Sequence, residues 1–211
     1  MQKMLIWGSE GGIGQAVLDK FQKEGWEVAA AAREITGRSA SAEWKMEADF
    51  RDKAEVQQAV IALADQGLTF DLFVFAAGDI ASLKIGESEP EHWQRILDNN
   101  LTAAYLTLQA SLPVLAEEAG IFLLGAVSER LQLPGLSAYA AAKAGLEAMA
   151  AAFAKEARSK KVTVVRPGAV ATNLWDKVPF NQPEHAYQPE QIAEKIWEAY
   201  QAGHKGQLDL T

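Results

Sequence analysis

The feature that most constrains the fold of this chain is a regular alternation of short apolar runs and longer amphipathic runs. Residues 71–78 (DLFVFAAG) and 120–126 (GIFLLGA) are continuously apolar, which is typical of strands covered on both faces. Residues 12–23, 52–66 and 189–202 instead repeat apolar side chains at helical spacing. Strand–helix units in series predict a doubly wound parallel sheet with helices on both faces, an α/β fold.

The remaining elements fit this order. Two long helices are expected, from Pro90 to about residue 113 and over about residues 136–158. Further strands are expected at residues 3–8, 25–33, 43–49, 161–168 and 206–211. The 211 residues are enough for one such domain and too few for a comfortable second one. We therefore expect a single domain over residues 1–211.

Composition excludes several classes of function. The formal net charge of −8 and the scattered basic residues argue against binding nucleic acid or an anionic membrane surface. With no cysteine and three isolated histidines, no metal site is expected. No apolar stretch approaches the length of a membrane span, so we expect a soluble, cytoplasmic protein.

Residues 8–14 (GSEGGIG) form a glycine-rich turn between the first strand and the first helix. The spacing of Gly8, Gly12 and Gly14 suits a tight turn, a close backbone approach to a pyrophosphate, and packing of helix on strand. The free amides at the helix N-terminus then attract phosphate. We expect a dinucleotide site here, and the alternative is a glycine-rich turn that binds nothing.

The end of the second predicted strand bears on which dinucleotide binds. A basic residue there favours the 2′-phosphate of NADP, whereas an acidic one favours the ribose hydroxyls of NAD. The chain has Ala32 followed by Arg33, which favours NADP(H) over NAD(H). The alternative is that Arg33 is a solvated surface cation.

Tyr139 and Lys143 stand four residues apart in the alanine-rich helix, and this spacing places both side chains on one face. A nearby ammonium lowers the pKa of a phenol, so the pair is a candidate for acid–base chemistry. The least regular segment, residues 173–188, follows the sixth predicted strand. Loops beyond the carboxyl ends of strands form the ligand crevice, so this segment is a candidate substrate lid.

Six segments in order resemble the short-chain dehydrogenase/reductase family over nearly the whole chain. They are GSEGGIG (8–14), ADFRD (48–52), FAAG (75–78), DNNLTAAYLTLQA (98–110), SAYAAAKAG (137–145) and RPGAVATNL (166–174). The resemblance implies a Rossmann fold and an oxidoreductase that uses a nicotinamide cofactor. It also implies Tyr139 as general acid and base, Lys143 as its partner, and Asn100 as support for a water in the proton relay. Because Asn99 is adjacent, the register of that asparagine is open by one.

Other positions acquire cofactor roles through the same resemblance. Asp49 matches the residue near the adenine ring, Gly78 the close backbone approach, and Thr172 the nicotinamide end. Two alternatives remain: Asp49 caps the helix that follows it, and Thr172 is a turn residue. Further cofactor contacts are implied at the matching motif positions Ser9, Ile13, Ala77, Pro167 and Gly168.

The chain also departs from the family pattern. Ala126 stands where the family has a serine that hydrogen-bonds the substrate, thirteen residues before the tyrosine. Either Ser128 replaces that serine as a catalytic residue, or Tyr139 acts alone. Dihydropteridine reductases also lack the serine, and the opening segment resembles theirs. Ala76 and Trp7 replace a family asparagine and threonine.

The expected function is NADPH-dependent reduction of a small carbonyl or imine-like compound, with Tyr139 as proton donor. The alternatives are an NADP-binding sensor or scaffold with weak or no catalysis and, more narrowly, reduction of a quinonoid dihydropterin. The family pattern implies a homodimer or homotetramer formed through the small-residue helices over residues 98–112 and 138–157. Packing of both helices onto their own sheet would explain the small residues equally well.

Overall fold

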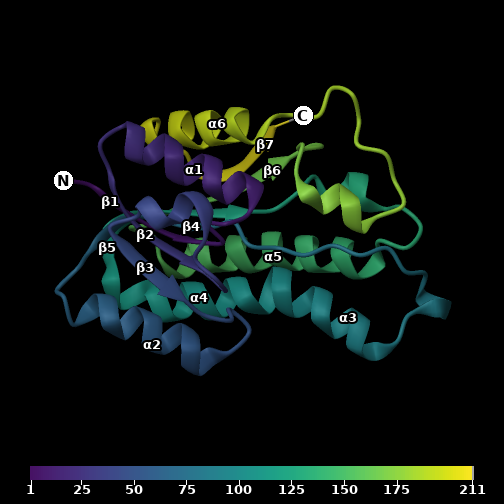
Figure 1. The fold of residues 1–211 in the computed structure, drawn as a ribbon, viewed down its shortest axis with the longest axis horizontal. Coiled ribbons are helices and arrows are strands. Elements are labelled where there is room, and N and C mark those ends of the chain that lie inside the picture. Colours follow the sequence, from purple (N-terminus) through teal and green to yellow (C-terminus); the bar gives the residue numbers. More distant parts are fainter. Residues whose placement is uncertain (211) are drawn as a thin grey trace.

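The computed structural model describes residues 1–210, apart from the side chain of Arg38. A seven-stranded parallel sheet runs through the molecule in the order β3-β2-β1-β4-β5-β6-β7 (Figure 1). The strands are β1 (Lys3–Trp7), β2 (Glu27–Ala32), β3 (Trp44–Glu47), β4 (Phe70–Phe75), β5 (Leu115–Leu124), β6 (Lys161–Pro167) and β7 (Gly206–Leu210). The helices are α1 (Gly12–Lys23), α2 (Lys53–Ala64), α3 (Pro90–Leu97), α4 (Ala103–Ser111), α5 (Ser137–Glu156) and α6 (Pro189–Gln201). The predicted doubly wound α/β fold is confirmed.

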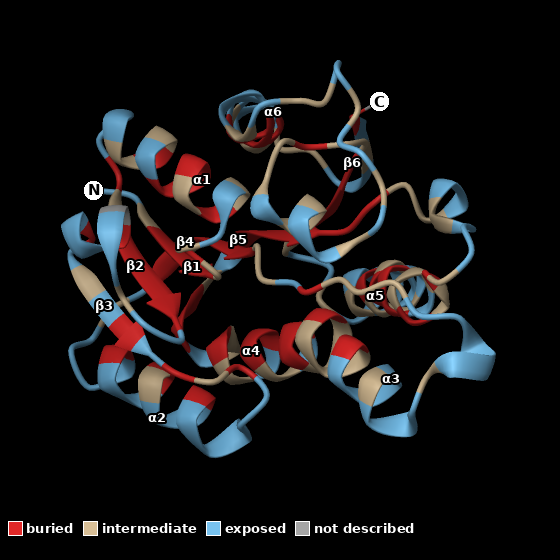
Figure 2. Cartoon of the chain, turned by 45° about the vertical axis from the view of Figure 1, so that its right-hand side comes forward, coloured by how far each residue is buried: buried red, intermediate tan, exposed pale blue. Residues whose placement is uncertain are grey.

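Helices cover both faces of the sheet and create two separate apolar cores. Helices α1 and α6 pack on one face, and α2, α4 and α5 pack on the other (Figure 1). Strand β1 contributes to both cores, because Met4 and Ile6 face α1 while Leu5 and Trp7 face the opposite layer. Figure 2 shows the strands as the most deeply buried part of the chain. This burial on both faces is why the strands read as continuous apolar runs.

Strand β2 shows tertiary structure overriding local propensity. Its alanines favour a helix in isolation, yet Ala29, Ala30 and Ala31 are fully buried between β1 and β3. Small side chains allow the helical layers to approach this part of the sheet closely. The large side chain of Trp7 fills the neighbouring space on β1, and its indole nitrogen donates to Ser111 Oγ on α4 at 3.3 Å.

The long helix predicted from Pro90 is interrupted. A π-helical segment, η3 (Asp98–Thr102), separates α3 from α4. The wider turn adds a residue to the helix and changes which side chains point inward. Asn100 lies in this segment and is fully buried.

Candidate active site

A cleft of about 1140 Å³ opens at the edge of the sheet where the strands end. Its walls include the segments that follow each of the strands β1 to β6. Because all strands are parallel, residues far apart in sequence meet at this one edge. Most of the predicted site residues line the cleft: Gly8, Gly12, Ile13, Arg33, Asp49, Ala77, Gly78, Tyr139, Lys143, Pro167, Gly168 and Thr172.

The glycine turn after β1 is formed as its spacing requires. Gly8 has φ +97°, and a Cβ there would lie 2.5 Å from the backbone nitrogen of Ala77. A Cβ on Gly14 would lie 2.0 Å from the carbonyl oxygen of Gly8, so only glycine allows α1 to pack against this turn. Gly14 is buried there and does not line the cleft.

The turn also leaves α1 with an open N-terminus at the cleft. Gly11 precedes the helix, lines the cleft and provides no side-chain cap, and the first turn carries no acidic residue. Its first amides therefore fit the pyrophosphate of a dinucleotide. The Ser9 side chain points away from the cleft and donates to the carbonyl oxygen of Ala31 at 3.2 Å.

Charged groups gather where the cleft passes the end of β2. Asp49 forms an ion pair with Arg51, and this contact lowers the pKa of Asp49 to about 2 against the opposing effect of partial burial. Arg33 is exposed, lines the cleft and contributes a smaller share of that lowering. The alternative that Asp49 caps the next helix is wrong, because Asp52 accepts the amides of Ala54 and Glu55 at the start of α2.

Tyr139 and Lys143 meet on the face of α5 that borders the cleft. The Lys143 Nζ lies 5.5 Å from the centre of the Tyr139 ring and donates to the carbonyl oxygen of Leu124 at 2.8 Å. Burial lowers the pKa of Lys143 to about 8, and the side chain is only 4% exposed. Burial, with a smaller contribution from the Asp79 carboxylate, raises the pKa of Tyr139 to about 12.

Asn100 lies behind the cleft rather than in its wall. Its amide nitrogen donates to the carbonyl oxygens of Asp79 and Ile96 at 2.7 and 2.8 Å, and its Oδ1 accepts from the Asp79 amide at 3.4 Å. The neighbouring Asn99 lines the cleft, and its side chain donates back to the carbonyl oxygen of Arg95. Asn100 is therefore the residue that fixes the backbone next to Gly78.

Ser128, the predicted replacement for the missing serine, lies in the segment that follows β5. Ala126 and Val127 line the cleft, whereas Ser128, the first residue of a short 3-10 helix η5 (Ser128–Leu131), does not. The Ala126 carbonyl oxygen accepts from Arg166 Nε at 3.3 Å, which holds this backbone against β6.

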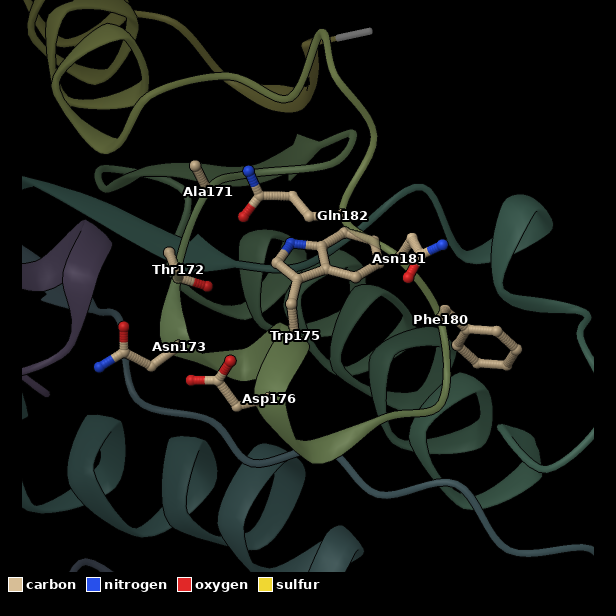
Figure 3. A pocket seen from close by; sticks show the side chains of 8 residues that line it. All are labelled: Ala171, Thr172, Asn173, Trp175, Asp176, Phe180, Asn181 and Gln182. Carbon is tan, nitrogen blue, oxygen red and sulfur yellow. The ribbon is translucent and has the colours of Figure 1, made fainter.

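Residues 172–186 form a loop beyond β6, here called the cleft loop. Its base is closed by backbone hydrogen bonds of Tyr187 with Ala169 and Ala171, each 2.8 Å long. It contains a short 3-10 helix, η6 (Asn173–Lys177), and it lines the cleft on one side and a pocket of about 400 Å³ on the other. Figure 3 shows Trp175 in the middle of that pocket, between the side chains of Thr172 and Asn181.

The sequence analysis missed an ion-pair cluster of Asp79, Arg95 and Lys177, and Asp79 is close enough to Tyr139 to affect its pKa. Asp79 accepts Lys177 Nζ at 2.7 Å and also pairs with Arg95. Asp79 directly follows the FAAG motif, and Lys177 lies in the predicted lid, so their positions were available as signals. Glu10, inside the glycine motif, was also missed; it lines the cleft and accepts the amide and hydroxyl of Thr36.

The family model for short chain dehydrogenases matches residues 2–182. The chain belongs to this family. A 3-oxoacyl-[acyl-carrier-protein] reductase of Synechocystis sp. is 30% identical to it over 92% of this chain and 87% of the relative. A serine 3-dehydrogenase of Rhizobium radiobacter is 28% identical over 81% of this chain and 73% of the relative.

Solved structures of a dehydrogenase and a reductase share the fold. An alcohol dehydrogenase from Thermococcus sibiricus, complexed with 5-hydroxy-NADP, aligns with a TM-score of 0.88 at 20% identity, over 100% of this chain and 96% of the other. A 3-ketoacyl-(acyl-carrier-protein) reductase from Brucella melitensis, complexed with NADH, aligns with a TM-score of 0.86 at 23% identity, over 99% and 96%. Within residues 1–210, no helix is long and apolar enough to span a membrane.

We predict that the buried Lys143 makes stability rise with pH. Its pKa falls from 10.5 in the unfolded chain to about 8 in the folded one, so the unfolded chain binds more protons between these values. The free energy of unfolding should therefore gain roughly 2 kcal/mol from this group between pH 7 and 9.5. Urea denaturation at both pH values measures it, with Lys143→Met as the comparison. An equal pH dependence in wild type and Lys143→Met would contradict the prediction.

Proposed function

We propose that this short-chain dehydrogenase is an NADPH-dependent reductase of a small carbonyl or imine-like compound, with Tyr139 as the proton donor. The observation that carries the proposal is that Tyr139 and Lys143 border the same cleft as the open N-terminus of α1. The names of the Synechocystis and Brucella relatives, both acyl-carrier-protein reductases, support a reductase of carbonyl groups.

The state of Tyr139 suits donation rather than acceptance of a proton. A phenol with a pKa of about 12 is fully protonated at neutral pH. When NADPH is bound, it supplies the hydride to the substrate carbon. Tyr139 gives its proton to the oxygen or nitrogen of the same double bond, and Lys143 stabilises the resulting phenolate through its positive charge. Asn100 fixes the backbone beside Gly78, and this fixed backbone borders the place of the predicted relay water.

The rest of the cleft fits the cofactor in the orientation that the proposal needs. The amides of α1 receive the pyrophosphate, and Arg33 receives the adenosine 2′-phosphate. Lys143, Pro167, Gly168 and Thr172 then lie toward the nicotinamide. The cleft loop is proposed as the lid predicted over residues 173–188, which encloses the substrate within a single domain.

A second candidate is an NADPH-binding protein with weak catalysis, and the alanine at position 126 favours it. Without a second hydroxyl, the developing alkoxide has one hydrogen-bond donor fewer than in most of the family. Dihydropteridine reductase activity is the narrower alternative, because those enzymes work without the serine. NADPH oxidation with quinonoid dihydropterin, measured beside simple ketones, separates these possibilities.

We expect Tyr139→Phe to lower kcat about 100-fold or more, because the ring remains and only the donated proton is lost. The measurement is NADPH oxidation with the best carbonyl of a panel, together with the Kd of NADPH, which should stay within twofold. Tyr105→Phe, on the exposed face of α4, is the control. Near-full turnover in Tyr139→Phe would remove Tyr139 from the role of acid.

We expect Arg33→Ala to raise the Kd of NADPH about 10-fold or more while leaving that of NADH within twofold, because only NADPH carries the 2′-phosphate. Calorimetric titration of both cofactors measures this. Arg158→Ala, which removes an exposed arginine that does not line the cleft, is the control. An equal loss for both cofactors would make Arg33 a general contributor to binding and leave NADP preference unsupported.

The catalytic role predicted for Ser128 is tested against the action of Tyr139 alone. Because Ala126 lines the cleft and Ser128 does not, we expect Ser128→Ala to keep kcat within about twofold and Ala126→Ser to raise it about 10-fold. Steady-state NADPH oxidation by both variants gives the answer. A loss of about 100-fold in Ser128→Ala would restore Ser128 as the second hydroxyl.

We also propose a homodimer or homotetramer built on the α4 and α5 layer. Trp93 on α3 and Tyr105 on α4 leave 41% and 50% of their surfaces exposed there. Light scattering at micromolar concentration should give two or four chain masses, and Tyr105→Asp should shift the protein toward one chain mass. A single chain mass for the wild type would mean that these helices pack only on their own sheet.

A further inference from the structure

The carboxylate of Asp79 joins two segments that are distant in sequence, α3 and η6. Its side chain is only 10% exposed and lies between Lys177 of η6 and Arg95 of α3, both of which form ion pairs with it. Its backbone is held on both sides by the Asn100 side chain in the π-helical segment. Asp79 itself does not line the cleft, whereas Lys177 does. The carboxylate is therefore placed to hold Lys177 in position at the cleft.

Lys177 belongs to the cleft loop. Backbone hydrogen bonds fix the base of the loop at Tyr187, and Trp175 Nε1 donates to the nearby carbonyl oxygen of Val170 at 2.8 Å. Among the described side chains, which do not include that of Arg38, the contact of Lys177 with Asp79 is the one ion pair that joins residues 172–186 to the rest of the chain. Without it, η6 would be held by the Trp175 hydrogen bond to Val170, the loop base and packing.

The two partners of Asp79 have different tasks. Arg95 comes from a helix that packs on α5, so it compensates the carboxylate charge from the body of the protein. Lys177 comes from the loop, so its bond with Asp79 is the one that can open when the loop moves. A buried carboxylate with one fixed partner and one movable partner is a suitable anchor. When the bond to Lys177 opens, the carboxylate of Asp79 stays paired with Arg95 and the ammonium of Lys177 is exposed to solvent.

We propose that Asp79 is a positioning residue of the active site, which fixes the cleft loop over the cleft by holding Lys177. Asp79 directly follows Gly78, and a Cβ on Gly78 would lie 2.9 Å from Asn100 Oδ1 and 3.7 Å from Lys143 Nζ. The anchor thus directly follows the backbone that packs beside Lys143, and it sets the position of the cleft loop relative to Tyr139. Its effect on substrate rests on the proposed reductase function, whereas its effect on the loop does not.

The test is hydrogen–deuterium exchange of the full chain without ligand, read at the amides of residues 173–178. Asp79→Asn and Lys177→Met should each speed exchange there by about 3- to 10-fold, since both remove the same ion pair. The double variant should exchange no faster than the quicker single variant, because the two changes act on one bond. Lys195→Met breaks an exposed pair with Glu198 on α6 and should leave residues 173–178 unchanged.

An unchanged exchange rate of residues 173–178 in Lys177→Met would overturn the proposal. So would a double variant whose increase in exchange rate equals the product of the two single increases. Lys177 is a loop residue with half of its side chain in solvent, so this variant tests the anchor even if Asp79→Asn does not fold. A second readout applies once a carbonyl is turned over: Lys177→Met should raise its KM about 3- to 10-fold and leave the Kd of NADPH unchanged. A fall in kcat with unchanged KM would contradict the positioning role.

Failure of the anchor and failure of the proposed function are distinguishable. If no carbonyl is reduced by the wild type, the exchange experiment still gives its result, because it involves no turnover. If carbonyls are reduced but residues 173–178 exchange at the same rate in all variants, the proposed reductase function is supported and the proposed role of Asp79 is wrong.

Discussion

The hydrogen bond from Lys143 to the carbonyl oxygen of Leu124 is the contact on which the site depends. The ammonium of Lys143, the one buried ammonium of the described site, lies between α5 and the end of β5. This bond therefore sets the rotation of α5 relative to the sheet. With α5 in that rotation, Tyr139, one turn earlier, borders the cleft. Burial of an ammonium costs free energy, as the pKa of about 8 shows, and a structure that served stability alone would avoid it.

The charged side chains differ between the two ends of the cleft. At the end toward β2, Arg33 lies near an Asp49 carboxylate that is already paired with Arg51, so Arg33 remains available to an anion. At the other end, Asp79 is compensated by Arg95 and Lys177 and still raises the pKa of Tyr139. The two ends thus favour an anionic ligand at one place and a protonated phenol at the other.

Much of the fold and cleft could be predicted because the information is local. Apolar runs buried on both faces mark strands, and strand ends in a parallel sheet share one edge, so the loops after the strands were expected to form the ligand crevice. The family resemblance implied Gly78 and Thr172 as cofactor contacts, and both line the cleft with the glycine turn. The pairing of Asp79 with Lys177, 98 residues away, depends on a loop conformation that no periodicity encodes. The conformation at Ser128 is a similar case, because this residue begins a short 3-10 helix that no periodicity encodes. The π-helical turn at Asn100 was missed because apolar spacing does not resolve a single added residue.

In the proposed reaction, this cleft brings a nicotinamide and a carbonyl carbon together beside a proton-donating tyrosine. The most direct measurement uses NADPH that carries deuterium on the transferable position of the nicotinamide, a panel of small carbonyl compounds, and mass spectrometry of the products. The expected product is an alcohol with one deuterium on its carbinol carbon. Binding of NADPH with no deuterated alcohol from any member of the panel would contradict it.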